Sequence, residues 1–147
     1  TFKEERKNVK NIEKTFSIIE LNTADSLSLQ AIKGISNSLA KRIIKYRNIL
    51  GGYAHIEQLK EVYGMRENTY NKISPYLSVD TTFIKKIDVN KASIEKLKYH
   101  PYLNFYQAKA IIEERKKLGK ISSKKELENL KDFSEEQIEK IYPYLLF

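Results

Sequence analysis

The chain has 147 residues, of which 41% are hydrophobic, and a formal net charge of +8 at pH 7. The positive balance favours a polyanionic partner such as a nucleic acid, and the absence of cysteine excludes a disulfide framework and thiolate metal sites. The sequence contains no apolar run long enough to span a membrane and no hydrophobic start typical of a signal peptide.

The sequence contains one unit twice. Residues 87–147 align with residues 19–79 at a constant offset of 68 without a gap, and eighteen of the aligned pairs are identical. Most identical pairs are apolar or turn-forming, which is what two copies of one packed unit keep. We therefore predict a polar leader segment or helix over residues 1–18, a first repeat over residues 19–79, a linker over residues 80–86 and a second repeat over residues 87–147.

The first half of the first repeat has the pattern of two helices joined by a tight turn. Short polar side chains precede the first helix, so we predict Asn22, and Asn90 in the second repeat, to be helix N-caps. Gly34 interrupts the helical pattern where a positive φ is needed. Ser36 then starts a second helix as its N-cap, with apolar residues at the spacing of one buried stripe.

The second half repeats this plan. Gly51 and Gly52 end the long helix, a third helix stops at Gly64, and a fourth stops before Pro75. The second repeat follows the same order, with capping-box patterns at Ser123/Glu126 and Ser134/Gln137. No stretch alternates with a period of two, so we predict an all-α fold with four short helices per repeat, and most tyrosines as packing residues.

The sequence shows no arrangement of residues that predicts catalysis. His55 and His100 are the only histidines, and neither has a carboxylate cluster at metal-ligand spacing or a nucleophile with an orienting partner. We therefore predict no enzyme activity, no metal and no cofactor.

The turn at Gly34 is the part of the sequence that points to a binding function. A turn leading into a helix N-terminus leaves amide groups that can bind phosphate. Residues 26–56 contain no acidic side chain but five basic ones, which are Lys33, Lys41, Arg42, Lys45 and Arg47. Contacts of this kind hold the phosphate backbone and read no bases, so we expect sequence-independent, salt-sensitive binding.

The order of these motifs resembles a known family. A Gly-Ile-Ser turn at 34–36, a basic helix at 40–47, a Gly-Gly-Tyr stretch at 51–53, Gly64-Met65 and an Ile-Ser-Pro-Tyr-Leu stretch at 73–77 follow one another, and the second repeat copies the order. This pattern resembles the ComEA-type competence DNA receptors, whose domain is a pair of helix-hairpin-helix motifs. The resemblance covers residues 19–147 and implies a pair of such motifs in each repeat.

The resemblance also implies a set of binding residues and a location. At the two turns of the first repeat, the predicted DNA-binding residues are Gly34, Ile35, Ser36, Ser38, Gly64 and Met65, and the nearby Lys41, Arg42 and Lys45 are predicted to add charge. The stretch 100–111 resembles the terminal repeat of longer, membrane-anchored relatives from Bacteroidetes-type bacteria. This likeness implies that further repeats and an anchor lie upstream, and that the full-length protein is extracytoplasmic or membrane-anchored.

The sequence departs from the family pattern mainly in the second repeat. Ser36 stands where the family turn has a second glycine, and Tyr102, Asn104 and Asp132 occupy glycine positions of the second repeat. Side chains there would crowd a phosphate and Asp132 would repel it, so we expect the hairpin at Gly34 to supply most of the binding.

Three hypotheses for function follow. The first is a non-enzymatic module that binds double-stranded DNA without sequence preference in DNA uptake or a competence-like process. The second is a degenerate helix-hairpin-helix scaffold that binds a protein partner or the chain's own upstream repeats. The third is an accessory domain of a DNA-processing enzyme. None of the three needs a small-molecule substrate.

Overall fold

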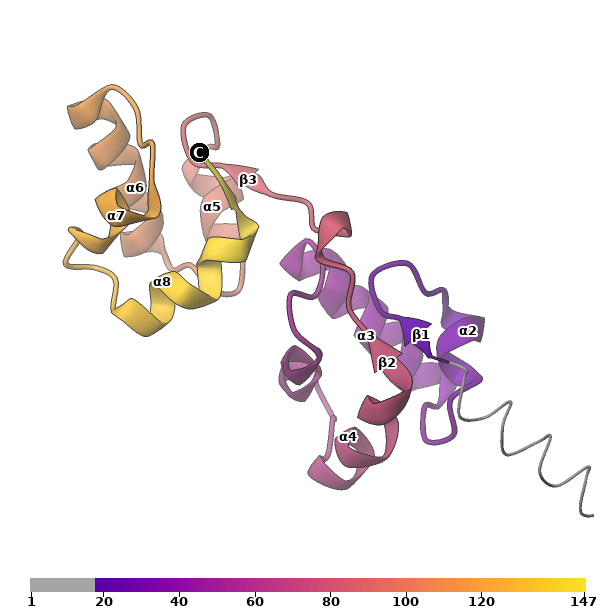
Figure 1. Ribbon diagram of the computed structural model, residues 1–147. Coiled ribbons are helices and arrows are strands. Elements are labelled where there is room, and N and C mark those ends of the chain that lie inside the picture. The colour runs from indigo at the N-terminus through magenta and orange to yellow at the C-terminus, as the bar shows by residue number, and fades with distance from the viewer. Residues whose placement is uncertain (1–17) are drawn as a thin grey trace, which may run out of the picture. The chain divides into compact units, whose positions relative to one another are not determined.

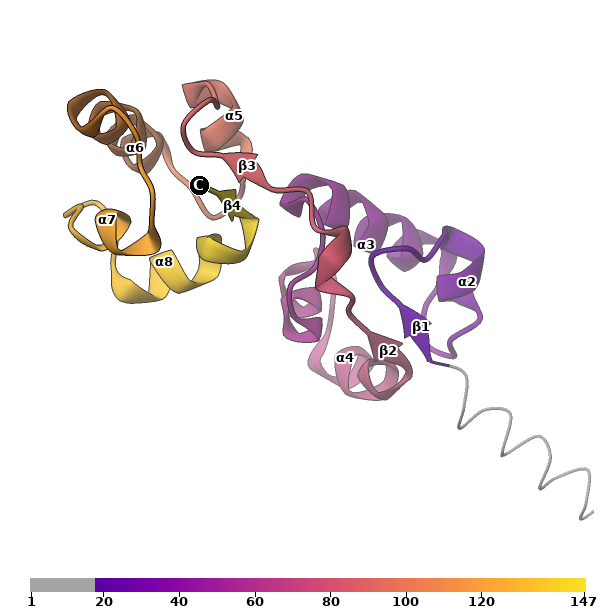
Figure 2. The same ribbon diagram turned by 45° about the horizontal axis from the view of Figure 1, so that its top comes forward.

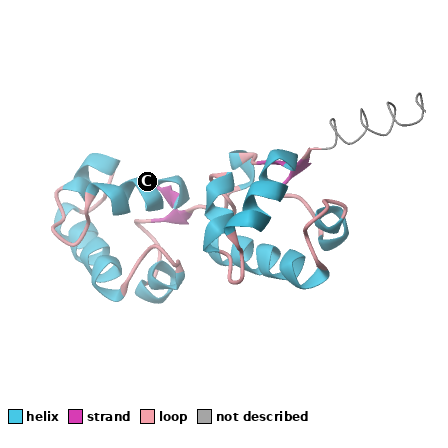
Figure 3. Cartoon of the chain, turned by 90° about the horizontal axis from the view of Figure 1, so that it is seen from below, coloured by secondary structure: helices cyan, strands magenta, loops and turns pink. Residues whose placement is uncertain are grey.

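A computed structural model describes residues 18–147, and these residues form two compact units (Figure 1). Unit 1 comprises the described residues up to Tyr46 together with Tyr53–Thr81, and unit 2 comprises Arg47–Gly52 together with Thr82–Phe147. The predicted leader lies outside the described residues except for Ile18. Helices dominate both units (Figure 3).

Unit 1 contains the helices and strands of the first repeat. In chain order its elements are β1 (Ile19–Glu20), α2 (Ser26–Gln30), α3 (Asn37–Leu50), the 3-10 helix η1 (Ile56–Glu61), α4 (Glu67–Ile73), the 3-10 turn η2 (Ser74–Tyr76) and β2 (Leu77–Ser78). The last residues of α3, from Arg47 onward, group with unit 2.

Unit 2 repeats this order. After the 3-10 turn η3 (Thr81–Phe83), its elements are β3 (Ile87–Asp88), α5 (Ile94–Tyr99), α6 (Phe105–Leu118), α7 (Lys124–Glu128), α8 (Glu135–Ile141), the 3-10 turn η4 (Tyr142–Tyr144) and β4 (Leu145–Leu146). The prediction of a mainly helical fold with four short helices per repeat is confirmed, with the difference that the third helix of the first repeat is a 3-10 helix.

Each unit is closed by a pair of short parallel strands that the sequence did not predict. Ile19 pairs with Leu77 in unit 1, and Ile87 pairs with Leu145 in unit 2. Figure 2 shows β4 beside β3. Strands of two residues are too short to show a period of two, which explains why the alternation test missed them.

Within each unit the two helical hairpins are themselves related. In unit 1 a shift of 30 residues places Leu29 on Leu59 and Ile43 on Ile73, and all four side chains are fully buried. In unit 2 the corresponding residues are Leu97, Leu127, Ile111 and Ile141, which are also fully buried. Each such side chain contributes about 1.5–3 kcal/mol when it is removed from water. The two hairpins of a unit therefore form one core between them.

Asn22 and Asn90 are not helix N-caps, so that prediction is wrong. Asp25 caps α2 instead, by accepting from the Ser28 amide at 2.8 Å. The Asn22 side chain accepts from the Tyr53 amide at 2.7 Å and donates to the Tyr53 carbonyl at 2.9 Å and the Asp80 carbonyl at 3.0 Å. Asn90 makes the same pair of bonds to Ile121. Each asparagine thus fixes the loop after the long helix to the start of its repeat.

The predicted caps of the later helices are confirmed in part. Ser36 accepts from the Leu39 amide at 3.2 Å as predicted, and Ser134 forms a capping box with Gln137. Ser123 occupies the N-cap position of α7, but its hydroxyl makes no cap bond, and Glu126 accepts instead from the Ser122 amide at 2.6 Å.

The tyrosines differ widely in burial. Tyr53 and Tyr144 are fully buried, and the Tyr53 hydroxyl donates to the Ile43 carbonyl at 2.7 Å. By contrast, the side chains of Tyr63, Tyr99 and Tyr106 are 85%, 69% and 70% exposed. The packing interpretation holds for Tyr53 and Tyr144 and is wrong for Tyr99 and Tyr106.

Candidate functional site

Both turns of unit 1 have the same backbone geometry. The Ile35 amide donates to the Ile32 carbonyl at 3.1 Å, and the Met65 amide donates to the Val62 carbonyl at 3.0 Å. The third residue of each four-residue turn is a glycine with positive φ, 112° at Gly34 and 79° at Gly64. A turn closed in this way with positive φ at its third residue is of type II.

The corresponding turns of unit 2 keep the closing hydrogen bond but change type. The Leu103 amide donates to the His100 carbonyl at 3.0 Å, and the Phe133 amide donates to the Leu130 carbonyl at 3.2 Å. The third residues are Tyr102 and Asp132, and among the described residues only glycines have positive φ. Negative φ at this position gives a type I turn, in which the middle peptide is flipped relative to type II. The amide at the third position therefore faces the opposite way in unit 2.

The start of α3 offers amide groups next to the Gly34 turn. The first amides of a helix have no intrahelical acceptor, and here the Ser36 hydroxyl takes only that of Leu39. The amides of Asn37 and Ser38 precede it in the same turn, and both residues are exposed. With the positive end of the helix dipole, this arrangement favours an anion at the turn.

A basic side chain from each hairpin of unit 1 lies at the turn of the other. The Arg42 guanidinium reaches from α3 to the second turn, where Nη1 donates to the Tyr63 carbonyl at 2.9 Å. A Cβ atom at Gly64 would lie 2.2 Å from that nitrogen, so glycine makes room for the guanidinium. Lys72 reaches from α4 in the same way, with its Cδ 3.2 Å from the Cβ position of Gly34. The Arg42 charge therefore lies at the second turn, and the aliphatic part of Lys72 lies against the first.

The other predicted residues divide into exposed and buried ones. Lys41, Lys45 and Ser38 are exposed on the first part of α3. Ile35 is buried in the core and Met65 is half-buried, so these two hold the turns in place and do not project from them. The structure thus places the polar predicted residues at the surface around the two turns.

Lys72 is the site residue that the sequence analysis missed. It lies 38 residues beyond Gly34, and nothing in the motif at 29–44 indicates that a residue of α4 lies beside it. The 30-residue internal shift carries the signal, because it relates Arg42 to Lys72 and Gly34 to Gly64.

Unit 2 has lost part of this chemistry, although Lys140 stands at the position of Lys72. Ala110 and Glu113 stand at the positions of Arg42 and Lys45, and the equivalent of Lys41, Lys109, lies 3.9 Å from the Glu113 carboxylate. Capping boxes take up the amides of Asn104 and Gln107 after the first turn and those of Ser134 and Gln137 after the second, whereas Ser36 takes up only the Leu39 amide. The hairpins of unit 2 therefore offer a phosphate fewer free amides and fewer cations than those of unit 1.

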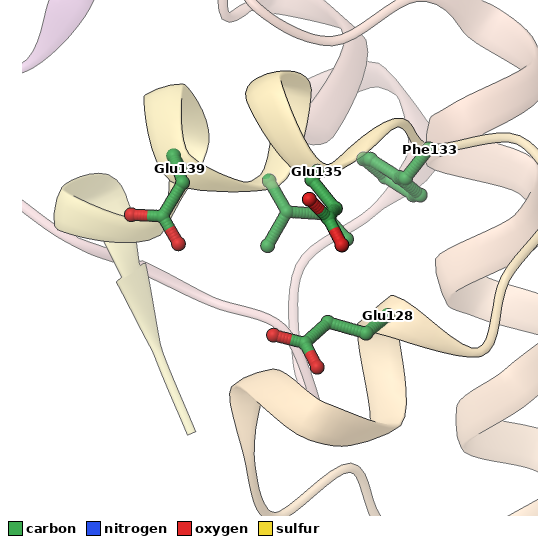
Figure 4. A pocket seen from close by; sticks show the side chains of 5 residues that line it. Glu128, Phe133, Glu135 and Glu139 are labelled. Atoms are coloured by element: carbon green, nitrogen blue, oxygen red, sulfur yellow. The ribbon is translucent and has the colours of Figure 1, made fainter.

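The turn at Asp132 also borders an acidic pocket of about 350 Å³ (Figure 4). Its lining residues are Glu128, Phe133, Glu135, Ile138 and Glu139, and the Glu139 carboxylate accepts from the Lys124 ammonium. Hydrogen bonding to Glu139 raises the pKa of Lys124 above its ordinary value, so this lysine stays charged. Three carboxylates in one pocket repel a polyanion.

The described part of the chain shows no group of three or more metal-ligating side chains of the His, Cys, Asp and Glu types that could hold a metal ion. Among residues 18–147 no helix has both the length and the apolar character that a membrane crossing requires.

Comparison with known proteins agrees with this geometry. The family described as "Helix-hairpin-helix motif" matches residues 14–78 and 82–146, so each repeat gives one match and together they cover most of the chain. A curated relative, ComE operon protein 1 of Bacillus subtilis (strain 168), is 35% identical over 63 residues. That alignment covers 43% of this chain and 31% of the relative, so the chain spans under a third of the relative's length. No solved structure matches the chain. The chain therefore belongs to the helix-hairpin-helix family, as a tandem pair of domains of the ComEA type.

Proposed function

We propose that unit 1 binds double-stranded DNA through its backbone phosphates, without reading base sequence, in DNA uptake or a competence-like process. Membership of the helix-hairpin-helix family and similarity to a protein of the ComE operon support DNA as the ligand. By the resemblance described above, the full-length protein acts outside the cytoplasm or attached to a membrane, and the chain captures DNA without catalysing a reaction.

The observation that carries this proposal is that each type II turn of unit 1 has a basic side chain from the other hairpin beside it. At Gly34 and Gly64 the backbone is exposed, and neither residue has a side chain of its own. Lys72 and Arg42 lie beside these turns, and Lys41 and Lys45 add charge along α3. Amide groups and cations facing one region bind phosphate oxygens by charge-assisted hydrogen bonds.

The same geometry accounts for the lack of sequence preference. The contacts come from main-chain amides and from side chains at the turns, which are suited to phosphate oxygens. Base sequence is read at base edges in the grooves, which contacts to phosphate do not reach. We expect affinity to be equal for duplexes of different sequence and to fall with added salt.

The test is a titration of a fluorescent duplex of random sequence, followed by anisotropy at two salt concentrations. Lys41→Ala combined with Arg42→Ala should weaken binding about tenfold or more, since each removed phosphate contact contributes to the electrostatic free energy. Gly34→Glu should abolish it, because the new carboxylate would face the phosphate. Circular dichroism checks that each variant folds.

The duplication provides a matched control. Lys41 and Lys109 are the same residue at the same position of the two repeats, but Lys109 lies near Glu113 in a hairpin without type II geometry. Lys109→Ala should therefore change duplex affinity less than twofold, about the size of measurement error. Equal losses for Lys41→Ala and Lys109→Ala would refute the assignment of binding to unit 1.

A further inference from the structure

The third hairpin of the chain carries exposed aromatic side chains where the first hairpin carries small and polar ones. Tyr99 ends α5, and Phe105 and Tyr106 begin α6, on either side of the turn at 100–103. Their exposed fractions are 69%, 48% and 70%. At the equivalent positions of the first hairpin stand Ala31, Asn37 and Ser38. We call Tyr99, Phe105 and Tyr106 the aromatic cluster.

The cluster does not serve the core of unit 2. Tyr102, between these residues, packs against His100 and Tyr144, and its ring lies 5.3 Å from the Lys140 ammonium. Phe105 and Tyr106 instead contact each other edge to face, with ring centroids 5.6 Å apart. Large aromatic side chains exposed next to one another mark a binding surface more often than isolated ones do.

The charge around the cluster indicates the kind of ligand. Residues 96–112 contain no acidic side chain and include the exposed lysines Lys96 and Lys98, besides Lys109, which lies 3.9 Å from the Glu113 carboxylate. Aromatic rings next to lysines are the combination that binds single-stranded nucleic acid, because bases stack on the rings and phosphates lie near the cations. A duplex keeps its bases stacked on each other and cannot use the rings in this way.

We propose that the aromatic cluster of unit 2 binds unpaired nucleobases of single-stranded DNA. The loss of the type II turn and of Arg42's counterpart then marks a change of ligand form from paired to unpaired DNA. The inference rests on the proposed function in taking DNA as the ligand, but it concerns other residues and another form of DNA.

The experiment titrates the whole chain against a fluorescent oligothymidylate of about 20 nucleotides, a length that exceeds the site sizes of common single-strand binders. A second oligonucleotide of equal length has abasic sites in place of the bases and keeps every phosphate. We expect the abasic strand to bind at least fivefold more weakly, because only the normal strand can stack. Equal binding of the two strands would overturn the proposal without any variant of the protein.

Variants test the assignment to the cluster. Phe105→Ala and Tyr106→Ala should each weaken binding of the normal strand about fivefold or more and leave duplex binding unchanged. Phe83→Ala is the matched control, because Phe83 is an aromatic residue of similar exposure, 52%, that lies outside all four hairpins. A loss as large for Phe83→Ala as for Tyr106→Ala would contradict the proposal.

The outcomes separate this inference from the proposed function. Single-strand binding that depends on Tyr106 in a chain that fails to bind duplex would sink the proposed function and support the inference. Duplex binding that depends on Lys41 and Arg42, with no base-dependent strand binding, would do the reverse. In that second case the aromatic cluster would be assigned to a protein partner.

Discussion

Asn22 shows how one side chain holds two distant loops. It bonds both backbone groups of Tyr53, which is fully buried, and also the Asp80 carbonyl. We predict that Asn22→Ala lowers the free energy of unfolding by about 2–3 kcal/mol, because the paired backbone groups lose their partner. Urea denaturation measures the change. The exposed Asn71 is the control, where an alanine should cost less than about 0.5 kcal/mol. Equal effects at both positions would contradict this account of Asn22.

The carboxylate of Asp25 leads to a prediction of how the stability of the protein depends on pH. The amide and hydroxyl of Ser28 hydrogen-bond to its carboxylate and lower the pKa of Asp25 below the ordinary 3.8. A lowered pKa in the folded state means that the carboxylate stabilises the protein above pH 3.8 and that this stabilisation is lost as the pH falls through the lowered value. Asp25→Asn keeps an N-cap acceptor but cannot titrate.

We therefore expect Asp25→Asn to be less stable than the parent at pH 7, with a difference that disappears on acidification below pH 3.8. Melting temperatures measured from pH 7 to pH 2.5 test this. Asp25→Ala removes both the charge and the cap bond and should stay less stable across the whole range. A constant difference for Asp25→Asn would show that the carboxylate's charge plays no part.

At the scale of an element, two glycines with φ near 79° allow two costs of a glycine-to-alanine substitution to be measured separately. One is the strain of a positive φ, and the other is the loss of a side-chain contact. Gly64 and Gly119 have the same φ, but a Cβ atom at Gly64 meets Arg42, whereas one at Gly119 meets nothing within 4 Å. Gly119→Ala should cost about 1–2 kcal/mol for alanine at positive φ. Gly64→Ala should cost about 1 kcal/mol more, because Arg42 loses its bond to the Tyr63 carbonyl.

A double-mutant cycle checks the cause of the excess. In the Arg42→Ala background the extra cost of Gly64→Ala should vanish, since the guanidinium is no longer there to be displaced. Chemical denaturation of the parent, both single variants and the double variant provides the four values. Persistence of the excess without Arg42 would assign it to strain of the turn itself.

Sequence patterns predicted the hairpins well because their signals are local. Gly34, Ser36 and the apolar stripe of α3 each act within a few residues of the chain, and the structure confirms them. The role of Asn22 was mispredicted because a short polar residue before a helix has the same pattern whether it caps that helix or bonds a distant loop. Its partners, Tyr53 and Asp80, lie 31 and 58 residues away.

The candidate site was predicted less completely for the same reason. Lys72 lies at the Gly34 turn only because α4 packs beside the first hairpin, which the motif around Gly34 does not encode. The sequence shows that Tyr102 replaces a glycine. It does not show that the turn keeps its closing hydrogen bond while the middle peptide flips from type II to type I. The exposure of Tyr106 likewise could not be predicted from its local sequence pattern.

At the scale of the whole molecule, the net charge of +8 is larger than the charge that we expect to contact DNA. Four basic side chains of unit 1 are those that we expect to contact phosphate, namely Lys41, Arg42, Lys45 and Lys72. If these neutralise about four phosphates, the logarithm of the duplex affinity should fall against the logarithm of salt concentration with a slope of about −3.6.

Affinities measured at several salt concentrations give this slope directly. Equal use of both units would double the number of phosphates and give a slope of about −7, which would contradict the assignment of duplex binding to unit 1. Charge removal at Lys109 should leave the slope unchanged, whereas Arg42→Ala should reduce its magnitude by about 1.

The parallel strand pairs determine how each unit responds to force. In unit 1 the chain enters along β1 and leaves along β2 in the same direction, and β3 and β4 repeat this in unit 2. A force that pulls the two ends of a unit apart therefore acts along the first strand in one direction and along the second strand in the opposite direction. The hydrogen bonds between the strands, including the bond from the Leu21 amide to the Ser78 carbonyl at 2.9 Å, are loaded together in shear and do not open one by one. The strand pair therefore resists a force that pulls the two ends of a unit apart, as happens to a domain that holds one end of a polymer under tension.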